Sequence, residues 1–242
     1  MKALILAAGY ATRLYPLTLN FPKPLLKVGG RPIVEYIIAK IAGAGADEIF
    51  IVTNDKYYPH FLDWSRSFKS NVPVKIINDG TKSNEDRLGA VGDINFVITR
   101  ENIHEDLMII AGDNLFEFDL NCLVNLSINR KSSAIAARDI NDLEAVKKFS
   151  TLILDNNSRI IEFIEKPPQP KTTLIGTACY VLKKEDVEEL KKCFKEMKPD
   201  NLGDFIAYLI SKKDVYAYVF SEQWFDIGSH EQLKEADIFY SK

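Results

Sequence analysis

Short apolar runs alternate along the first third of the chain with segments that carry apolar residues at helical spacing. The runs at 3–7, 48–54 and 74–77 are bounded by polar residues and are typical of buried strands. The segments 32–43 and 57–68 lie between these runs and indicate helices. Strands that alternate with helices predict βαβ units, and therefore an α/β protein with a mainly parallel sheet.

The rest of the chain continues the alternation with one departure. Two alternating segments, 151–154 and 160–164, flank the turn residues Asn156 and Asn157 and predict a β-hairpin. A hairpin inserted into a parallel α/β chain suggests a lid or an acceptor pocket beside the main sheet. Further strands are expected at 106–111, 133–138, 175–182 and 215–220, and further helices at 184–197, at 203–212 and after residue 229.

The first strand leads into a loop that combines small residues with two cations. Residues 4–9 read Leu-Ile-Leu-Ala-Ala-Gly, and small residues let the backbone approach a ligand and cradle phosphate with its N–H groups. Arg13 can hold phosphate oxygens with two parallel hydrogen bonds, whereas Lys23 is a compact point charge. Pro22 and Pro24 restrict the backbone on both sides of Lys23. The stretch predicts a site for a polyphosphate.

This stretch is neither a P-loop nor the dinucleotide-binding fingerprint, because Gly-Lys-Ser/Thr and Gly-x-Gly-x-x-Gly are both absent. It closely resembles the opening motif of the sugar nucleotidyltransferases: Leu-Ala-Ala-Gly-x-Gly-Thr-Arg-Leu, then Pro-Leu-Thr, then Pro-Lys-Pro-Leu. Ala11 stands where that family usually has its second glycine. The alternative interpretation, a buried strand followed by an ordinary basic loop, is disfavoured by the length of the composite motif.

Two aspartates complete the resemblance. Asp113 follows the run 106–111 in a Gly-Asp pair, at the carboxyl edge where open α/β sheets bind ligands. A carboxylate with phosphate oxygens and water is the ligand set that Mg²⁺ prefers. Asp113 could instead only cap the following turn. Asp226 lies in Trp-Phe-Asp-Ile-Gly-Ser, similar to the Trp-x-Asp-x-Gly-Thr/Ser that ends the catalytic core of the family. The resemblance implies that Asp113 and Asp226 bind Mg²⁺.

The resemblance also implies backbone contacts to the base and ribose of a nucleotide. One group of positions ends the first strand, and the other lies in a segment that only partly matches the family's Leu-Gly-Thr-Ala-Gly. For that second group, a solvent loop over 78–93 that merely joins strand to helix is the alternative. The positions concerned are Leu6, Ala7, Ala8, Gly9, Gly89 and Ala90.

The predicted hairpin ends in Glu165 and Lys166, followed by two prolines. Glutamate accepts hydrogen bonds from sugar hydroxyls and lysine holds phosphate, as the family's Glu-Lys-Pro does; a surface turn of mixed charge is the alternative. We also assign Ser150 and Thr177 to acceptor binding. Relatives that transfer to glucose 1-phosphate usually have glycine in place of Ser150 and Ala178. We therefore hypothesise that glucose 1-phosphate is not the best acceptor, unless backbone shifts absorb the two side chains.

By this resemblance, residues 1–242 are expected to form one nucleotidyltransferase domain with a Rossmann-like sheet flanked by helices. The implied reaction transfers a nucleotidyl group from an NTP to a sugar 1-phosphate and releases pyrophosphate. Arg13 would stabilise the leaving pyrophosphate, and Lys23 the α-phosphate. Two alternatives stay open: a relative that acts on phosphocholine or an inositol phosphate, and a catalytically silent nucleotide-sensing subunit. The base, the sugar and the formation of a homo-oligomer are left open as well.

Composition and charge argue against some classes of binding partner. A formal net charge of −3 without a basic block argues against nucleic acid, and no apolar run is long enough to span a membrane. The three cysteines are widely spaced, without zinc-pair spacing or a disulfide framework, so a reducing cytoplasm is expected. Hexapeptide repeats are absent, and we therefore expect no C-terminal β-helix within these residues.

Overall fold

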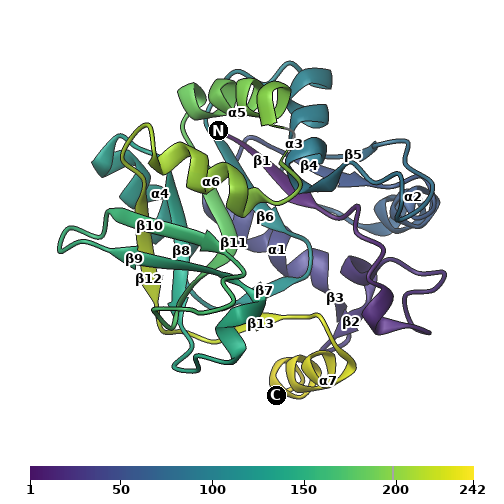
Figure 1. The fold of residues 1–242 in the computed structure, drawn as a ribbon. Helices are drawn as coiled ribbons and strands as arrows, with labels where there is room; N and C mark the ends of the chain where they lie inside the picture. Colours follow the sequence, from purple (N-terminus) through teal and green to yellow (C-terminus); the bar gives the residue numbers. More distant parts are fainter. Residues whose placement is uncertain (198) are drawn as a thin grey trace. The chain divides into compact units, whose positions relative to one another are not determined.

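The computed structural model describes residues 1–197 and 199–242, which divide between two units (Figure 1). The first unit combines three segments of the chain, Met1–Leu88, Ile110–Glu117 and Gln223–Lys242. The second combines Gly89–Ile109 and Phe118–Glu222. One boundary falls inside strand β6, Leu107–Ala111. Each unit is therefore built from segments that are distant in sequence.

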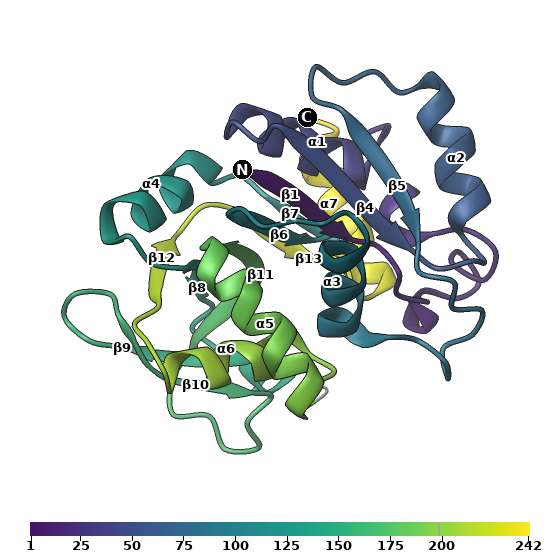
Figure 2. The same cartoon turned by 90° about the horizontal axis from the view of Figure 1, so that it is seen from above.

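The first unit is centred on three parallel strands, β1 (Lys2–Leu6), β4 (Glu48–Thr53) and β5 (Val74–Asn78), which run side by side in Figure 2. Helix α1 (Ile33–Gly43) lies between β1 and β4 in the chain, and α2 (Tyr58–Ser67) lies between β4 and β5. β1 and β4 are largely buried in the core, whereas Ile77 is the buried residue of β5. These five elements confirm the predicted βαβ pattern, each to within two residues at either end.

Short elements complete the first unit. Strands β2 (Lys27–Val28) and β3 (Arg31–Pro32) form one antiparallel pair, and β7 (Asn114–Phe116) and β13 (Trp224–Asp226) form another. Helix α7 (His230–Tyr240) follows, as predicted, with the Ser229 side chain capping its start. The short strands were not predicted, because two or three residues are too few to show an alternating pattern.

The second unit has a mixed sheet, in which β8 (Ala134–Asp139) is parallel to β12 (Tyr216–Phe220) and antiparallel to β11 (Leu174–Leu182). The predicted hairpin is present as β9 (Ser150–Leu154) and β10 (Ile160–Glu165). Strand β9 also pairs with β11, which attaches the hairpin to the sheet.

The α-helices that the structure describes in the second unit are α3 (Gly89–Arg100), α4 (Leu120–Arg130), α5 (Lys184–Met197) and α6 (Leu202–Ile210). Helix α6 lies across β10 in both views (Figures 1 and 2). Helix α4 was missed because it buries little apolar surface: only Leu120, Leu123 and Ser127 are inaccessible. The loop expected over 78–93 is also too long, because α3 already begins at Gly89.

The protein thus has the predicted α/β class, with a mostly parallel central sheet flanked by helices. The expectation of one domain over residues 1–242 stays a prediction. Among the described residues, no helix has both the length and the apolar character needed to cross a bilayer.

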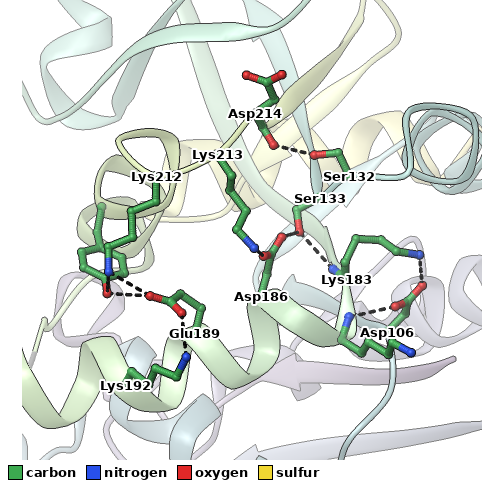
Figure 3. Close-up of polar contacts among 12 residues, drawn as sticks. Asp106, Ser132, Ser133, Lys183, Asp186, Glu189, Lys192, Lys212, Lys213 and Asp214 are labelled. Carbon is green, nitrogen blue, oxygen red and sulfur yellow. Dashed lines mark hydrogen bonds and ion pairs between the residues drawn. The ribbon is translucent and has the colours of Figure 1, made fainter.

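Glu189 on α5 centres a hydrogen-bonded cluster in the second unit (Figure 3). Its carboxylate accepts hydrogen bonds from Lys212 Nζ (2.9 Å), Tyr208 Oη (2.8 Å) and Lys192 Nζ (3.2 Å). Together these three hydrogen bonds outweigh the effect of burial and lower the pKa of Glu189 from 4.5 to about 2. The cluster therefore stabilises the folded state while Glu189 is ionised.

This shift predicts a pH-dependent stability. Because the folded-state pKa is depressed, the contribution is fully present above about pH 4.5 and is lost as the pH falls toward 2. We expect wild type and Glu189→Gln to differ most in free energy of unfolding near pH 6, and to converge as the pH approaches 2. Urea unfolding at both pH values measures this. Glu185→Gln, at an exposed side chain of the same helix, is the control. A difference that stays constant with pH would contradict the prediction.

Candidate functional site

The backbone after β1 is held in place at Leu6 and Ala7 and is open at Gly9. Leu6 O accepts from Gly112 N (2.8 Å), and Ala7 N donates to Val52 O (2.9 Å). Gly9 is exposed, and an added Cβ would meet no atom of the described residues within 4 Å. Packing within the protein therefore does not account for a glycine here. Its small size instead leaves the backbone of this loop open to a ligand.

Buried polar side chains hold the loop that follows. Asn54 donates from Nδ2 to Ala8 O (2.8 Å), and Tyr57 donates from its hydroxyl to Thr18 O (2.6 Å). Thr18 in turn donates from Oγ1 to Ala11 O (2.7 Å). Asn54, Tyr57 and Thr18 are fully buried. None of the three was predicted as a site residue, although Asn54 directly follows a strand at the carboxyl edge of the sheet, where polar residues are candidates for a site.

The Ala11 backbone explains why the family usually has glycine there. Its φ of 48° and ψ of 43° lie in the left-handed region, which is strained for residues with a Cβ. We expect Ala11→Gly to raise the free energy of unfolding by about 1 kcal/mol, because relief of this strain exceeds the added entropy of the unfolded chain. Urea unfolding measures the change.

Ala39→Gly is the matched control for that substitution. Ala39 is exposed in the middle of α1, where glycine should lower the free energy of unfolding by about 1 kcal/mol. Opposite signs for the two substitutions are expected. A loss of stability in Ala11→Gly would show that the left-handed geometry does not strain the fold.

Lys23 and Asp113 form an ion pair in the first unit. Lys23 Nζ lies 2.5 Å from Asp113 Oδ2 and also donates to Ile227 O (2.8 Å). Burial acts to raise the pKa of Asp113, but the charge and hydrogen bond of Lys23 outweigh it and keep this pKa below its ordinary value. Gly112 makes the arrangement sterically possible, since a Cβ there would lie 2.8 Å from Leu6 O and 3.2 Å from Pro24 Cγ.

Asp226 comes from a distant segment to the same place. It pairs with Asn114 across the β7–β13 ribbon, and Ile227 N donates to Asp113 O (3.1 Å). Burial and the neighbouring Asp113 carboxylate raise the pKa of Asp226 to about 6, against the opposing charges of Lys23 and Arg13. Burial beside a second carboxylate therefore disfavours the ionised form of Asp226.

Arg13 completes this cluster. It lies in the short 3₁₀ helix Thr12–Leu14, and its side chain is exposed. A Cβ at Gly228 would lie 3.1 Å from an Arg13 terminal nitrogen, so the glycine after Asp226 leaves room for the guanidinium. The first unit thus brings together the four residues predicted for catalysis and metal binding, Arg13, Lys23, Asp113 and Asp226.

Two carboxylates fit a divalent cation that takes its remaining ligands from elsewhere. Within residues 1–197 and 199–242, no group of three or more Asp, Glu, His or Cys side chains is arranged to hold a metal ion. A dedicated protein cage is therefore absent from the described residues. Mg²⁺ commonly uses one or two carboxylates, with water and substrate phosphates as the other ligands.

Three of the predicted acceptor residues lie together in the second unit. Ser150 Oγ donates a short hydrogen bond to Glu165 Oε2, and Lys166 Nζ lies 3.1 Å from Glu165 Oε1. Gly203 in α6 faces this pair, because a Cβ there would overlap the Glu165 carboxylate and lie 2.8 Å from Ser150 Oγ. The Glu165 carboxylate is therefore fixed by both of its oxygens.

Thr177 is not exposed beside them. It is buried, and its Oγ1 donates to Ala136 O (3.1 Å). It lies where the β11–β8 register shifts, and the next residue, Ala178, has a left-handed φ of 51°. Two of the three positions at which this chain departs from a family glycine, Ala11 and Ala178, thus have a backbone that favours glycine. Acceptor binding by Thr177 stays a prediction.

Gly89 and Ala90 form the first turn of α3. Gly89 has a φ of 75°, and a Cβ there would overlap the Asp200 carboxylate. Val91 N also donates to Asp200 O (3.4 Å). The shape of this turn therefore depends on glycine, whereas the proposed contact to a nucleotide base stays a prediction.

Comparison with known proteins places the chain. The family model described as nucleotidyl transferase matches residues 2–242. A Sulfolobus acidocaldarius protein, provisionally described as a mannose-1-phosphate guanyltransferase, is 32% identical over 235 residues, 94% of this chain and 60% of its own length. The bifunctional protein GlmU of Methanococcus aeolicus is 31% identical over 243 residues, 100% of this chain and 55% of its own length. The chain thus spans little more than half of these relatives.

Solved structures show the same fold. A Bacillus anthracis protein, provisionally described as a glucose-1-phosphate thymidylyltransferase, superposes with a TM-score of 0.85 at 23% identity, over 100% of this chain and 96% of its own. A UDP-glucose pyrophosphorylase complexed with UDP-glucose superposes with a TM-score of 0.85 at 22% identity, over 99% and 97%. At these identities the likeness concerns the fold alone. With the family model matched along residues 2–242, the chain belongs to the nucleotidyl transferase family.

Proposed function

We propose that the protein transfers a nucleotidyl group from an NTP to a sugar 1-phosphate. A phosphate oxygen of the acceptor forms a bond to the α-phosphorus, the bond from that phosphorus to the bridging oxygen of the β-phosphate breaks, and pyrophosphate leaves. The attacking oxygen is already ionised, so no catalytic base is needed, and the protein contributes positioning and charge stabilisation. The observation that carries this proposal is the cluster of Arg13, Lys23, Asp113 and Asp226 in the first unit.

Each side chain has a distinct task in this proposal. Asp113 and Asp226 would hold Mg²⁺, which supplies charge neutralisation to phosphate oxygens when it is bound. Lys23 would exchange its contact with Asp113 for one with the α-phosphate. Arg13, which is exposed, would stabilise the leaving pyrophosphate. The backbone of Leu6, Ala7, Ala8 and Gly9 would contact the base and ribose.

The acceptor would be bound by residues of the second unit. Lys166 would contact its phosphate, and Glu165 would accept hydrogen bonds from its hydroxyls. The contacts of Ser150 and Lys166 with the Glu165 carboxylate support this assignment, since they present it in one orientation.

One assay separates the candidate functions. Pyrophosphate release would be measured with UTP, dTTP, CTP and GTP, each alone and with a panel of sugar 1-phosphates, phosphocholine and an inositol phosphate. GTP with mannose 1-phosphate is the first pair to test, because the relative at 32% identity has that description. Release that requires a sugar 1-phosphate would support the proposal. The proposal would be overturned if pyrophosphate were released only with phosphocholine or an inositol phosphate. It would also be overturned if no acceptor of the panel gave release.

The acceptor preference gives a further prediction. Ser150 and Ala178 occupy positions at which relatives that use glucose 1-phosphate usually have glycine, and the Ser150 hydroxyl contacts Glu165. We expect another sugar 1-phosphate to give a higher kcat/KM than glucose 1-phosphate. The double variant Ser150→Gly, Ala178→Gly should shift the ratio toward glucose 1-phosphate by about 10- to 100-fold, which corresponds to roughly 1–3 kcal/mol.

Competition kinetics with paired acceptors would measure that ratio. Ser211→Gly, at the exposed end of α6, is a control of the same chemical change and should leave the ratio unaltered. Glucose 1-phosphate as the best acceptor of the wild type would contradict the hypothesis.

A further inference from the structure

A chain of hydrogen bonds runs from an indole to one of the two proposed metal ligands. Trp224 Nε1 donates to Asn114 Oδ1 (2.8 Å), and Asn114 Nδ2 donates to Asp113 Oδ1 (2.9 Å). Trp224 lies on β13 and Asn114 on β7, which pair as an antiparallel ribbon. That ribbon also carries Asp226, opposite Asn114. The three side chains and the second carboxylate thus belong to one structural piece of the first unit.

Only one orientation of the Asn114 amide satisfies this chain. An indole N–H can only donate, and an ionised carboxylate can only accept. The amide oxygen must therefore face Trp224, and the amide N–H₂ must face Asp113. Asn114 is 3% exposed, so water has little access to replace either bond. Removal of the indole donor would leave the Asn114 amide free to turn its oxygen toward Asp113. The amide oxygen would then repel the Asp113 carboxylate.

The chain fixes Asp113 by both of its oxygens. Oδ1 accepts from Asn114, and Oδ2 accepts from Lys23 at 2.5 Å. A carboxylate offers about four lone-pair directions, so roughly two remain for another partner. Their directions are set, because the group is held at both ends. A cation that binds there meets a ligand that is already oriented.

We propose that Trp224 and Asn114 are positioning residues that orient Asp113 as a ligand for a divalent cation. This inference rests on the proposed function, in which Asp113 and Asp226 hold that cation. Hydrogen bonds behind a metal ligand fix its orientation, and their loss commonly lowers metal affinity by about 10- to 100-fold. Neither residue is proposed to contact the reacting phosphates.

Trp224→Phe tests the proposal with the smallest change, because it keeps an aromatic ring and removes the N–H donor. Mn²⁺ would serve as the probe, and its dissociation constant would be measured by electron paramagnetic resonance on the unliganded protein. We expect about 10- to 100-fold weaker Mn²⁺ binding in Trp224→Phe, and a similar loss in Asn114→Leu. Trp64→Phe is the matched control, since it removes the other indole hydrogen bond of the chain, to Glu35 (2.9 Å). It should bind Mn²⁺ as the wild type does.

The variant Asp113→Asn distinguishes failure of the positioning role from failure of the proposed metal site. If Asp113→Asn weakens Mn²⁺ binding but Trp224→Phe and Asn114→Leu do not, the positioning role is wrong and the proposed metal site stands. If Asp113→Asn leaves Mn²⁺ binding unchanged, the proposed metal site is itself wrong.

A second measurement needs no folded Trp224 variant. The chain has two tryptophans, so the wild type should show two indole N–H resonances by NMR, and Trp64→Phe assigns them. Titration with Mg²⁺ should shift the Trp224 resonance and leave that of Trp64 in place. A Trp224 resonance that stays unmoved while Mg²⁺ binds would overturn the proposal.

Discussion

Arg13→Ala should lower kcat by about a hundredfold or more, with a much smaller change in KM. The guanidinium is exposed and, in the proposed reaction, faces charge that grows on the leaving pyrophosphate. Its contacts therefore strengthen in the transition state, and their loss affects the rate of chemistry more than substrate binding. Initial rates over a range of NTP concentrations would measure both constants.

Lys23→Ala should show a loss of the same order together with a second effect. Lys23 neutralises Asp113 in the absence of ligands, so its removal leaves that carboxylate without its cation. Affinity for Mn²⁺ should rise while kcat falls, a combination that Arg13→Ala should not show. Arg66→Ala, at an exposed ion pair on α2, is the control. Wild-type turnover in both Arg13→Ala and Lys23→Ala would refute these roles.

Asp226→Asn should abolish turnover, or allow it only at much higher Mg²⁺, and should also make the protein more stable. Asp226 is half-buried, and burial together with the neighbouring Asp113 carboxylate raises its pKa to about 6. A neutral amide removes the repulsion between the two carboxylates, so the melting temperature should rise as function is lost. Rates over a series of Mg²⁺ concentrations and thermal unfolding would test the two parts.

Asp113→Asn should lower activity in the same way but change stability in the opposite direction. It breaks the ion pair with Lys23, whose side chain is only 12% exposed, and leaves that ammonium without its carboxylate. Asp63→Asn, at an exposed carboxylate, should change neither property. An Asp226→Asn variant that is fully active at the wild-type Mg²⁺ concentration would exclude the metal role of Asp226.

Patterns within short stretches of sequence predicted the features that depend on neighbouring residues, such as the buried strands. The apolar runs became strands. The prolines were expected to restrict the backbone beside Lys23, and this residue begins a short 3₁₀ helix that was not itself predicted. The left-handed backbone at Ala11 was not predicted, although the family glycine pointed to that position. Helix α4 was missed because its pattern is weak.

Contacts between distant segments could not be predicted from the sequence. Asn114 and Trp224 are 110 residues apart, and each is an ordinary polar or aromatic residue in its own segment. The pairing of Lys23 with Asp113, 90 residues away, is likewise a property of the folded chain. The resemblance named both residues but implied separate tasks for them. Only the folded structure shows that Lys23, which was predicted to stabilise the α-phosphate, is also the counterion of Asp113.

The division of the first unit into three segments has a consequence for synthesis on the ribosome. Arg13, Lys23 and Asp113 are made early, but Asp226 belongs to Gln223–Lys242, which is translated after all of Phe118–Glu222. The β7–β13 ribbon therefore cannot form until the second unit has been translated completely. During that interval Asn114 lacks its indole donor, and nascent chains released early would lack a complete cluster. The cluster can therefore assemble only after the second unit has been synthesised.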